Sequence, residues 1–216
     1  MSKINIFESI INWIRFLELK SFTKQKACSN LLDLGCGNGL FLQLIRRHKI
    51  IATGIDKSPS PAPYIITSSI ETLKLNEKFD VVTIFHVLEH TENPFNILKI
   101  STSFLKKNGT LVIEVPLIGN ATEQFLKKEY FAYHDPSHIH FFTKKEIYNL
   151  IEKIGFTVKQ KGFTLLEFPF TLITSSFRKG VIFGLMSLIF FIPFKALSLL
   201  GLNDEIIRLY CVRKTS

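Results

Sequence analysis

The sequence predicts an α/β fold in which helices flank a mostly parallel, seven-stranded sheet. Short apolar runs alternate with amphipathic helical patterns along the 216 residues, as in parallel sheets with crossover helices. One run, 79–85 (FDVVTIF), is apolar almost throughout, as strands buried on both faces are. Another, 31–34, leads into three closely spaced glycines. The hydrophobic share of 46% and the charged share of 21% fit one globular domain with a full core.

An amphipathic helix is expected near the N-terminus, over residues 4–19. It would form a lid within residues 1–27, ahead of the main domain at 28–216. Its apolar side chains recur on one face, and we expect this face to pack on the domain. Trp13 and Phe16 widen the apolar face, so a helix lying on a membrane surface is the alternative. The apolar face comprises Ile4, Phe7, Ile10, Ile11, Ile14 and Leu17, and the opposite face Asn5, Glu8, Asn12 and Arg15.

The other elements follow in alternation. Strands are expected over 31–34, 50–55, 64–67, 79–85, 110–115, 156–166 and 205–213. Helices are expected over 40–48 and 94–105, and from Thr143, where Glu146 completes a capping box, to Gly155. Proline and serine disfavour a helix over 58–63 (SPSPAP). An Asn108-Gly109 turn is expected before the fifth strand.

An apolar helical insertion, about 167–204, precedes the last predicted strand. Lys195 is the only charge between Gly180 and Asn203, and Pro193 interrupts the run 181–194 (VIFGLMSLIFFIPF). A bilayer crossing needs roughly 20 apolar residues, and the strand that follows brings both ends of the insertion to one side. We expect a re-entrant or surface-lying helical hairpin that touches anionic lipid through 168–203, or an apolar helix buried in a dimer interface.

The glycine turn indicates a cofactor site. Gly35, Gly37 and Gly39 lack β-carbons, so the backbone can approach a ligand closely, and a helix N-terminus with free N–H groups follows. The dinucleotide fingerprint G-x-G-x-x-G would need a glycine where the chain has Leu40. Asp56 ends the second strand 21 residues after Gly35. A carboxylate there can accept hydrogen bonds from both ribose hydroxyls of a nucleoside cofactor, which fits NAD and S-adenosylmethionine equally.

Five segments together resemble the class I methyltransferases that depend on S-adenosylmethionine. The resemblance is to the broad small-molecule branch that includes ubiquinone-biosynthesis O-methyltransferases, and it covers about residues 28–165. The segments are LLDLGCGNG (31–39), GID (54–56), FDVVTIFHVLEHTENP (79–94), LKKNGTLVIEVP (105–116) and Gly155-Phe156. The resemblance implies a Rossmann-like fold and S-adenosylmethionine as the cofactor.

The resemblance also implies roles for individual residues. Asp56 would hold the ribose, Ser69 and Ile70 would lie by the adenine, and His86 would lie near the methionine end of the cofactor. Many relatives carry an acid where this chain has Ser69, so the chain departs from them at the adenine. The residues that would hold the methionine part are Asp33, Gly35, Gly37 and Gly39, with Cys36 as the small residue inside the turn.

The first of two histidine-rich segments is 86–90, which spells H-x-x-E-H. This is a zinc-protease pattern, but it needs a helix, and here it follows a buried strand. Some relatives carry an acidic version of this segment that binds a divalent ion. Glu89 and His90 match its end, whereas His86 does not match its start. We predict that the protein has no metal site.

The second histidine-rich segment is 133–142 (YHDPSHIHFF). Its three histidines and Asp135 could form a ligand cluster. Relatives usually have a histidine in this place, before a helix cap, and His138 matches it best, so a substrate-pocket loop that closes over the cofactor is the favoured interpretation. A hydroxyl acceptor needs a base to take its proton. We expect His138 to be that base, with His134 and His90 as alternatives.

Composition bounds the partners and the compartment. Lys and Arg number 27 against 18 acidic residues, a net charge of +9 that favours anionic partners or a solvated basic face. Cys28, Cys36 and Cys211 form no pairing pattern, which indicates a reducing compartment, and residues 1–20 lack the apolar core of a secretory signal. We expect a cytoplasmic protein with peripheral contact at the inner membrane surface.

The sequence therefore predicts an S-adenosylmethionine-dependent methyltransferase that O-methylates a hydrophobic or lipid-linked small molecule. A nucleic-acid acceptor, such as tRNA, is an alternative drawn from the net charge, although no aromatic–basic stacking motif supports it. A non-catalytic, membrane-associated protein that binds S-adenosylmethionine is another. The glycine spacing disfavours an NAD-dependent oxidoreductase.

Overall fold

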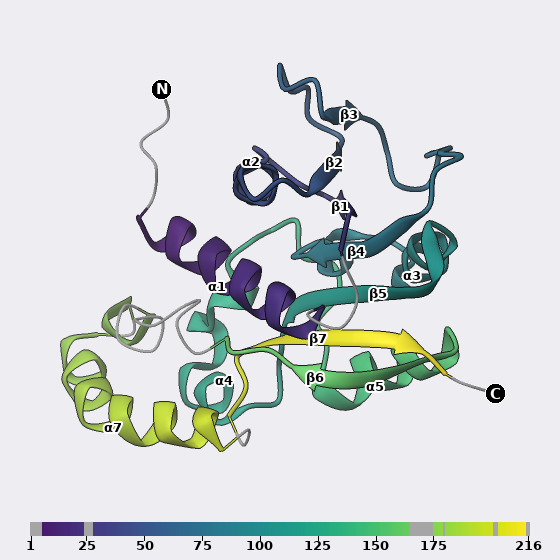
Figure 1. Ribbon diagram of the computed structural model, residues 1–216. Helices are drawn as coiled ribbons and strands as arrows, with labels where there is room; N and C mark the ends of the chain where they lie inside the picture. The colour runs from purple at the N-terminus through teal and green to yellow at the C-terminus, as the bar shows by residue number, and fades with distance from the viewer. Residues whose placement is uncertain (1–5, 24–27, 165–174, 179, 201–202, 215–216) are drawn as a thin grey trace.

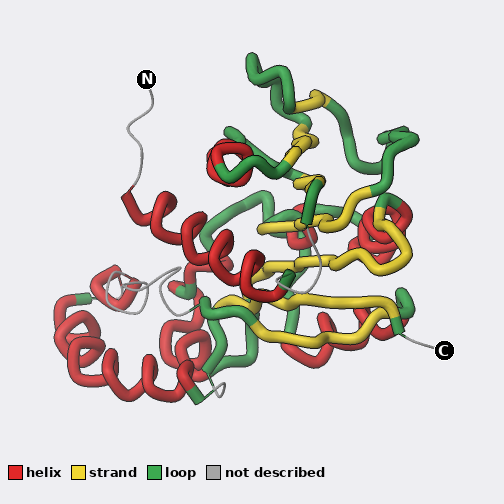
Figure 2. The backbone as a smooth tube through the Cα atoms, in the orientation of Figure 1, coloured by secondary structure: helices red, strands yellow, loops and turns green. Residues whose placement is uncertain are grey.

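The computed structural model describes residues 6–23, 28–164, 175–178, 180–200 and 203–214. One seven-stranded sheet runs through them in the order β3-β2-β1-β4-β5-β7-β6 (Figure 1). Neighbouring strands from β3 to β5 are parallel, and β7 pairs antiparallel with β5 and β6. Helices flank this sheet (Figure 2). The predicted Rossmann-like α/β fold with a mostly parallel, seven-stranded sheet is confirmed.

The strands are β1 (Asn30–Leu34), β2 (Ile51–Asp56), β3 (Ile65–Thr67), β4 (Phe79–Phe85), β5 (Leu105–Pro116), β6 (Phe156–Lys161) and β7 (Ile206–Arg213). The α-helices are α1 (Ile6–Phe22), α2 (Leu40–Arg47), α3 (Pro94–Ser103), α4 (Ala121–Leu126), α5 (Lys144–Lys153) and α7 (Val181–Leu199). Short 3-10 helices follow β4 and α4: η1 (Leu88–His90), η2 (Lys127–Glu129) and η3 (Phe131–Tyr133). Strand β6 ends at Lys161, so the predicted continuation to residue 166 is wrong over 162–164, which lie outside any strand, and its last part, 165–166, lies outside the described residues.

Strand β5 begins earlier than predicted, so the Asn108-Gly109 pair lies inside it and not in a turn before it. The register against β4 shifts between Phe79 and Val81, which marks an irregularity where extra residues of β5 are accommodated. A β-carbon on Gly109 would lie 3.1 Å from the carbonyl oxygen of Lys106. Glycine therefore permits a close backbone approach here without ending the strand.

Helix α1 buries a different face from the one predicted. Asn12, Phe16 and Leu19 are buried, whereas Ile10 and Leu17 of the expected packing face are 43% and 48% exposed. The prediction of the packed face was therefore wrong. The position of the helix in front of the sheet is visible in Figure 1.

Ion pairs between α1 and the sheet explain this orientation. Arg15 pairs with Glu114 of β5, and Glu18 pairs with Arg208 of β7 at 2.7 Å. Glu114 and Arg208 are wholly buried, and a buried charge is costly unless an opposite charge lies beside it. The polar face of α1 turns inward because it supplies those opposite charges.

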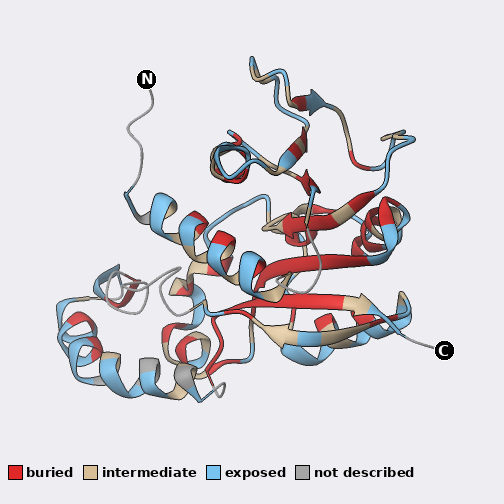
Figure 3. Ribbon diagram, viewed as in Figure 1, coloured by how far each residue is buried: buried red, intermediate tan, exposed pale blue. Residues whose placement is uncertain are grey.

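Helix α7 lies outside the domain, with α4 between it and the sheet (Figures 1 and 2). Phe191 of α7 packs against the small apolar cluster of Leu126, Tyr130 and Ala132. Most of the α7 surface is exposed, whereas β4, β5 and β7 are buried along most of their length (Figure 3). Within the described part of the apolar insertion, 181–199 thus form a helix, as predicted, and this helix is a single one and not a hairpin.

Candidate cofactor and acceptor site

The glycine turn joins β1 to α2 through backbone angles that glycine adopts far more readily than other residues. The φ angles of Gly35, Gly37 and Gly39 are +75°, +53° and +74°. A β-carbon on Gly35 would lie 2.3 Å from the Cγ2 of Val87, which leaves no room for it. A β-carbon on Gly37 would meet no atom of the described part of the chain within 4 Å, so Gly37 faces open space there.

A cavity of about 240 Å³ lies against this turn. Its lining brings together five of the predicted cofactor-binding residues: Asp33, Gly35, Cys36, Gly37 and His86. Sequence reasoning missed the contribution of α1, because the polar face of that helix was expected to point away from the domain. The further lining residues are Glu8, Asn12 and Arg15 of α1, and Asn38, Leu40, Phe41 and Phe85.

Asp56 stands at the carboxyl end of β2, beside the turn. Its carboxylate accepts hydrogen bonds from the N–H groups of Gly37 at 2.7 Å and Ser58 at 2.8 Å. Each bond uses a different oxygen, and a carboxylate oxygen has two lone pairs, so both oxygens keep acceptor capacity. Asp56 can therefore hold a diol while it also holds the turn.

Besides Asp56, three predicted cofactor residues do not line the cavity. Gly39 serves the packing of the turn, since a β-carbon there would lie 2.6 Å from Cδ1 of Ile65. Ile70 is buried in the main core cluster. The hydroxyl of Ser69 donates to Glu71. The adenine contact of Ser69 and Ile70 stays a prediction.

Asp33 is buried at the centre of the sheet. Burial raises the pKa of its carboxyl to about 7, although a hydrogen bond from the Thr83 hydroxyl, at 2.6 Å, opposes the rise. The hydrogen bond from Thr83 thus offsets only part of the free-energy cost of burying an ionised Asp33. A cationic or hydrogen-bonding group placed in the cavity would stabilise the charged form.

Glu114, which the sequence did not single out, is the centre of a buried charge cluster. Its carboxylate contacts Arg15, Arg208 and Nε2 of His86, the last at 3.0 Å. Burial alone would raise the pKa of Glu114, but the two guanidinium charges and the hydrogen bond from His86 hold it well below its usual range. The cluster joins α1, β5 and β7 at one point.

His86 follows β4 with a φ angle of +54°, which is unusual for a side-chain-bearing residue. Its Nδ1 lies 3.2 Å from Glu89 and its Nε2 lies 3.0 Å from Glu114. Burial would lower the pKa of the imidazole, but hydrogen bonds with the two carboxylates outweigh burial and raise it to about 9. His86 is therefore a cation at neutral pH, which suits it for orienting a ligand and not for accepting a proton.

The loop 134–140 packs on the segment after β4. The N–H groups of Ile139 and His140 both donate to the Glu89 carbonyl oxygen, at 2.8 and 3.0 Å. Nδ1 of His138 lies 2.7 Å from the Ala132 carbonyl oxygen, which can only accept, so Nδ1 carries the hydrogen and Nε2 keeps a lone pair. The ring centroids of His138 and His90 are 4.7 Å apart.

The two other base candidates differ in their surroundings. Nδ1 of His90 contacts the carbonyl oxygen of Ser137 at 3.1 Å and its hydroxyl at 2.9 Å, so His90 belongs to the same cluster as His138. His134 instead lies beside Glu129, 3.7 Å away, and contacts Arg178. The structure thus brings two of the three candidates together and leaves the third at the edge of the insertion.

Glu89 lies beneath these two histidines. It is wholly buried, and its Oε2 has no hydrogen-bond partner among the described residues. Donor atoms of Glu89, His90 and His138 lie within 4.8 Å of one another, a spacing that could hold a metal ion. The prediction that the protein has no metal site stays a prediction.

A family profile described as a methyltransferase domain matches residues 5–161 of the chain. Among curated proteins, the ubiquinone biosynthesis O-methyltransferase of Haemophilus ducreyi is 28% identical over 123 residues, which cover 48% of this chain and 52% of that protein. The corresponding enzyme of Histophilus somni is 30% identical over 100 residues, covering 38% and 42%. The matched segment thus spans about half the length of these relatives.

Solved structures share the fold. The plantazolicin methyltransferase BpumL in complex with SAH aligns with a TM-score of 0.63 and 18% identity, over 97% of this chain and 85% of that one. The magnesium protoporphyrin IX methyltransferase of Synechocystis, with bound SAH, aligns with a TM-score of 0.61 and 13% identity, over 99% and 90%.

Proposed function

The chain belongs to the family of S-adenosylmethionine-dependent methyltransferase domains, and we propose that it methylates a hydroxyl oxygen of a hydrophobic or lipid-linked small molecule at a membrane surface. The curated relatives named for ubiquinone biosynthesis support oxygen as the methylated atom. A cytoplasmic protein that touches the membrane peripherally would meet such an acceptor.

The cavity residues fit this cofactor. The open space at Gly37 allows a ligand to lie against the turn, and Asp56 beside it has lone pairs for the ribose hydroxyls. Asp33, Gly35 and Cys36 line the same cavity, as does His86, and they would hold the methionine part. When bound, S-adenosylmethionine supplies a methyl group on a positively charged sulfur, so the protein has mainly to align the acceptor and exclude water.

We assign the general base to His138. The Ala132 carbonyl fixes a hydrogen on Nδ1, so Nε2, which lies 3.9 Å from the Asp135 carboxylate, is the ring nitrogen that would take the proton of an acceptor hydroxyl. His90 is the second candidate, because its ring lies beside that of His138. His134 is the third, and its contact with Arg178 suits it better for shaping the acceptor entrance.

One observation supports a hydrophobic acceptor: the exposed aliphatic surface of α7 is connected to the histidine-containing loop 134–140. Arg178, just before α7, contacts His134 of that loop. An apolar surface of this size next to a site usually marks a membrane or an apolar ligand.

Incubation with radiolabelled S-adenosylmethionine and fractionated cell extract tests the proposal. We expect label in the organic phase after lipid extraction, stable to mild base as an ether is. His138→Ala should abolish transfer and keep cofactor affinity in calorimetry, whereas His140→Ala, in the same loop, should retain activity. Label only in the aqueous nucleic-acid fraction would overturn the assignment of the acceptor.

A further inference from the structure

Helix α7 turns an aliphatic face to the outside. Six side chains on that side are between 51% and 75% exposed, and none is polar. Helices that face water carry polar residues on the outer side, and a helix that is apolar all round belongs in an apolar medium. The inner side is the one with small residues, since Gly184 and Ser187 are buried. The six residues are Val181, Ile182, Leu185, Leu188, Ile189 and Ile192.

Both ends of α7 are attached to the domain. At its start, a β-carbon on Gly184 would lie 2.3 Å from the ring of Phe177, so the helix lies directly on the short helical segment 175–178, and Arg178 of that segment contacts His134 of the domain. At its end, the Ser198 hydroxyl donates to the Asn203 carbonyl oxygen at 2.6 Å, and Asn203 exchanges hydrogen bonds with Thr122 of α4 at 2.9 and 3.1 Å. Asn203 and Thr122 are buried, so buried hydrogen bonds anchor this end of α7 to α4.

The helix is also bent, by 54° between Val181–Ile189 and Phe191–Ser198. Pro193 accounts for a break here, because it has no N–H to donate to the carbonyl of Ile189. The two arms are roughly 13 and 12 Å long at 1.5 Å per residue, against a hydrocarbon core of roughly 30 Å. Each arm reaches no deeper than one leaflet. No single helix among the described residues is long and apolar enough to cross a bilayer.

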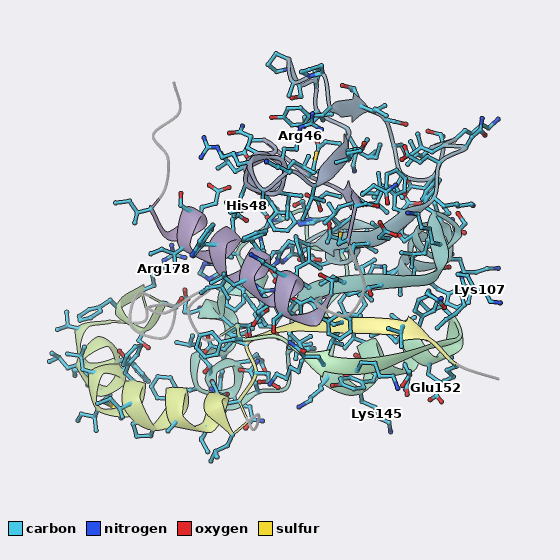
Figure 4. All side chains as sticks on the ribbon, viewed as in Figure 1. Arg46, His48, Lys107, Lys145, Glu152 and Arg178 are labelled. Atoms are coloured by element: carbon cyan, nitrogen blue, oxygen red, sulfur yellow. The ribbon has the colours of Figure 1, made fainter. Side chains whose placement is uncertain are left out.

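Cationic side chains lie at the attached side of α7. Arg178 precedes the helix (Figure 4), and Lys127 and Lys128 are exposed on η2, next to the cluster that receives Phe191. Cations at this level favour anionic headgroups by about 1 kcal/mol each. A second copy of the chain is a poorer partner for this face, because each copy carries a net charge of +9.

We infer that α7 inserts into one leaflet of an anionic phospholipid bilayer as a single bent helix, with Lys127, Lys128 and Arg178 at the headgroups. The inference deepens the proposed function and rests on it only for the source of the acceptor, which is then the same leaflet. The contact of Arg178 with His134 links the docked helix to the loop that carries the proposed base.

Flotation of the full chain with phosphatidylcholine vesicles, with and without phosphatidylglycerol, tests the inference. We expect Ile189→Gln/Ile192→Gln to lower the partition coefficient by about tenfold or more, since two aliphatic side chains leave the hydrocarbon. The matched control is Ile51→Gln/Ile66→Gln, two exposed isoleucines on β2 and β3, which should float as the parent does. Lys127→Gln/Lys128→Gln should reduce the preference for anionic vesicles, since only Arg178 of the three cations remains, and should keep weak binding to neutral ones.

Equal flotation of the parent and the Ile189→Gln/Ile192→Gln variant would overturn the inference. So would a parent chain that stays unbound but sediments as a dimer, if that variant sediments as a monomer. The proposed function is separated from the docking by assaying a detergent-solubilised lipid extract. Methyl transfer to that extract without flotation would contradict the membrane docking alone. Flotation without methyl transfer would contradict the proposed acceptor alone.

Discussion

Arg15 and Glu114 are 99 positions apart in the chain and form an ion pair in which the carboxylate is wholly buried. The guanidinium also lies 4.3 Å over the ring of Phe85 and bonds to Asn12. Arg15 lines the cavity at the same time. One side chain therefore contributes both to the attachment of α1, together with the Glu18–Arg208 pair, and to the wall of the candidate cofactor site.

Arg15→Ala should loosen α1 and weaken cofactor binding. Loss of a hydrogen bond to a charged group costs about 1.5–3 kcal/mol, enough to raise amide exchange along α1 while the sheet stays protected. Hydrogen–deuterium exchange and calorimetry with S-adenosylmethionine measure the two effects. Lys20→Ala, on the exposed side of the same helix, is the control and should change neither. Unchanged exchange in Arg15→Ala would contradict the role of the pair.

Gly37→Ala should separate cofactor binding from stability. The φ angle of +53° costs alanine about 1–2 kcal/mol, and the added methyl meets no protein atom within 4 Å. Gly155 has a φ of +78° and equally open space, but lies outside the cavity lining. Both variants should unfold at similarly reduced denaturant concentrations, and only Gly37→Ala should lose affinity for S-adenosylmethionine. Equal affinities would show that the ligand does not lie against Gly37.

Asp33 should make the folded state less stable as pH rises from about 4 to about 7. Its folded pKa is raised from 3.8 to about 7, so the native state holds a proton that the unfolded state has released over this window. The difference corresponds to about 4 kcal/mol. Asp33→Asn removes this dependence, so the stability of the variant relative to the parent should grow with pH in denaturant titrations.

Asp80→Asn is the matched control for Asp33. Burial alone would raise the pKa of Asp80, but hydrogen bonds from Lys106 and Ser29 lower it to about 2, so it stays ionised over the whole window. The difference between that variant and the parent should not change with pH. An Asp33→Asn difference that is equally flat would contradict the raised pKa.

His86 should titrate near pH 9 in the folded protein. An imidazole pKa raised from 6.5 contributes stability that is complete below about pH 6.5 and is lost as pH rises toward 9. A pH titration of the His86 ring resonances in NMR spectra measures this pKa directly. Glu89→Gln removes one of its two carboxylate partners and should lower the pKa. An ordinary pKa for His86 would contradict its ion pairs with Glu89 and Glu114.

Local patterns made the central part of the site predictable. The glycine turn and Asp56 are fixed by spacings of a few residues and by one strand end, and the structure places them side by side. The capping box of Thr143 and Glu146 is present for the same reason. The buried face of α1 was not predictable, because the charges that turn it inward lie on β5 and β7, and no short-range pattern pairs a helix with residues so distant.

Two other features escaped prediction for related reasons. Helix α4 and the 3-10 helices are too short to show a period. The Asn108-Gly109 pair has the composition of a turn, yet strand pairing with β4 continues on both sides of it. The cluster of His90, His138 and Glu89 was only half predicted, since the histidines stood out and the buried carboxylate beneath them was not assigned a catalytic role.

The ion pair between Glu18 and Arg208 has a consequence for folding during synthesis on the ribosome. These residues are separated by 190 positions, so α1 leaves the ribosome long before β7 exists. Until β7 has been inserted between β5 and β6, Glu18 has no Arg208 to bind, and Glu114 lacks one of its two guanidinium partners. A nascent chain that already contains the whole glycine turn therefore holds an unfinished cofactor site. The charge cluster around Glu114 is therefore complete only after β7 has been translated and has paired with β5.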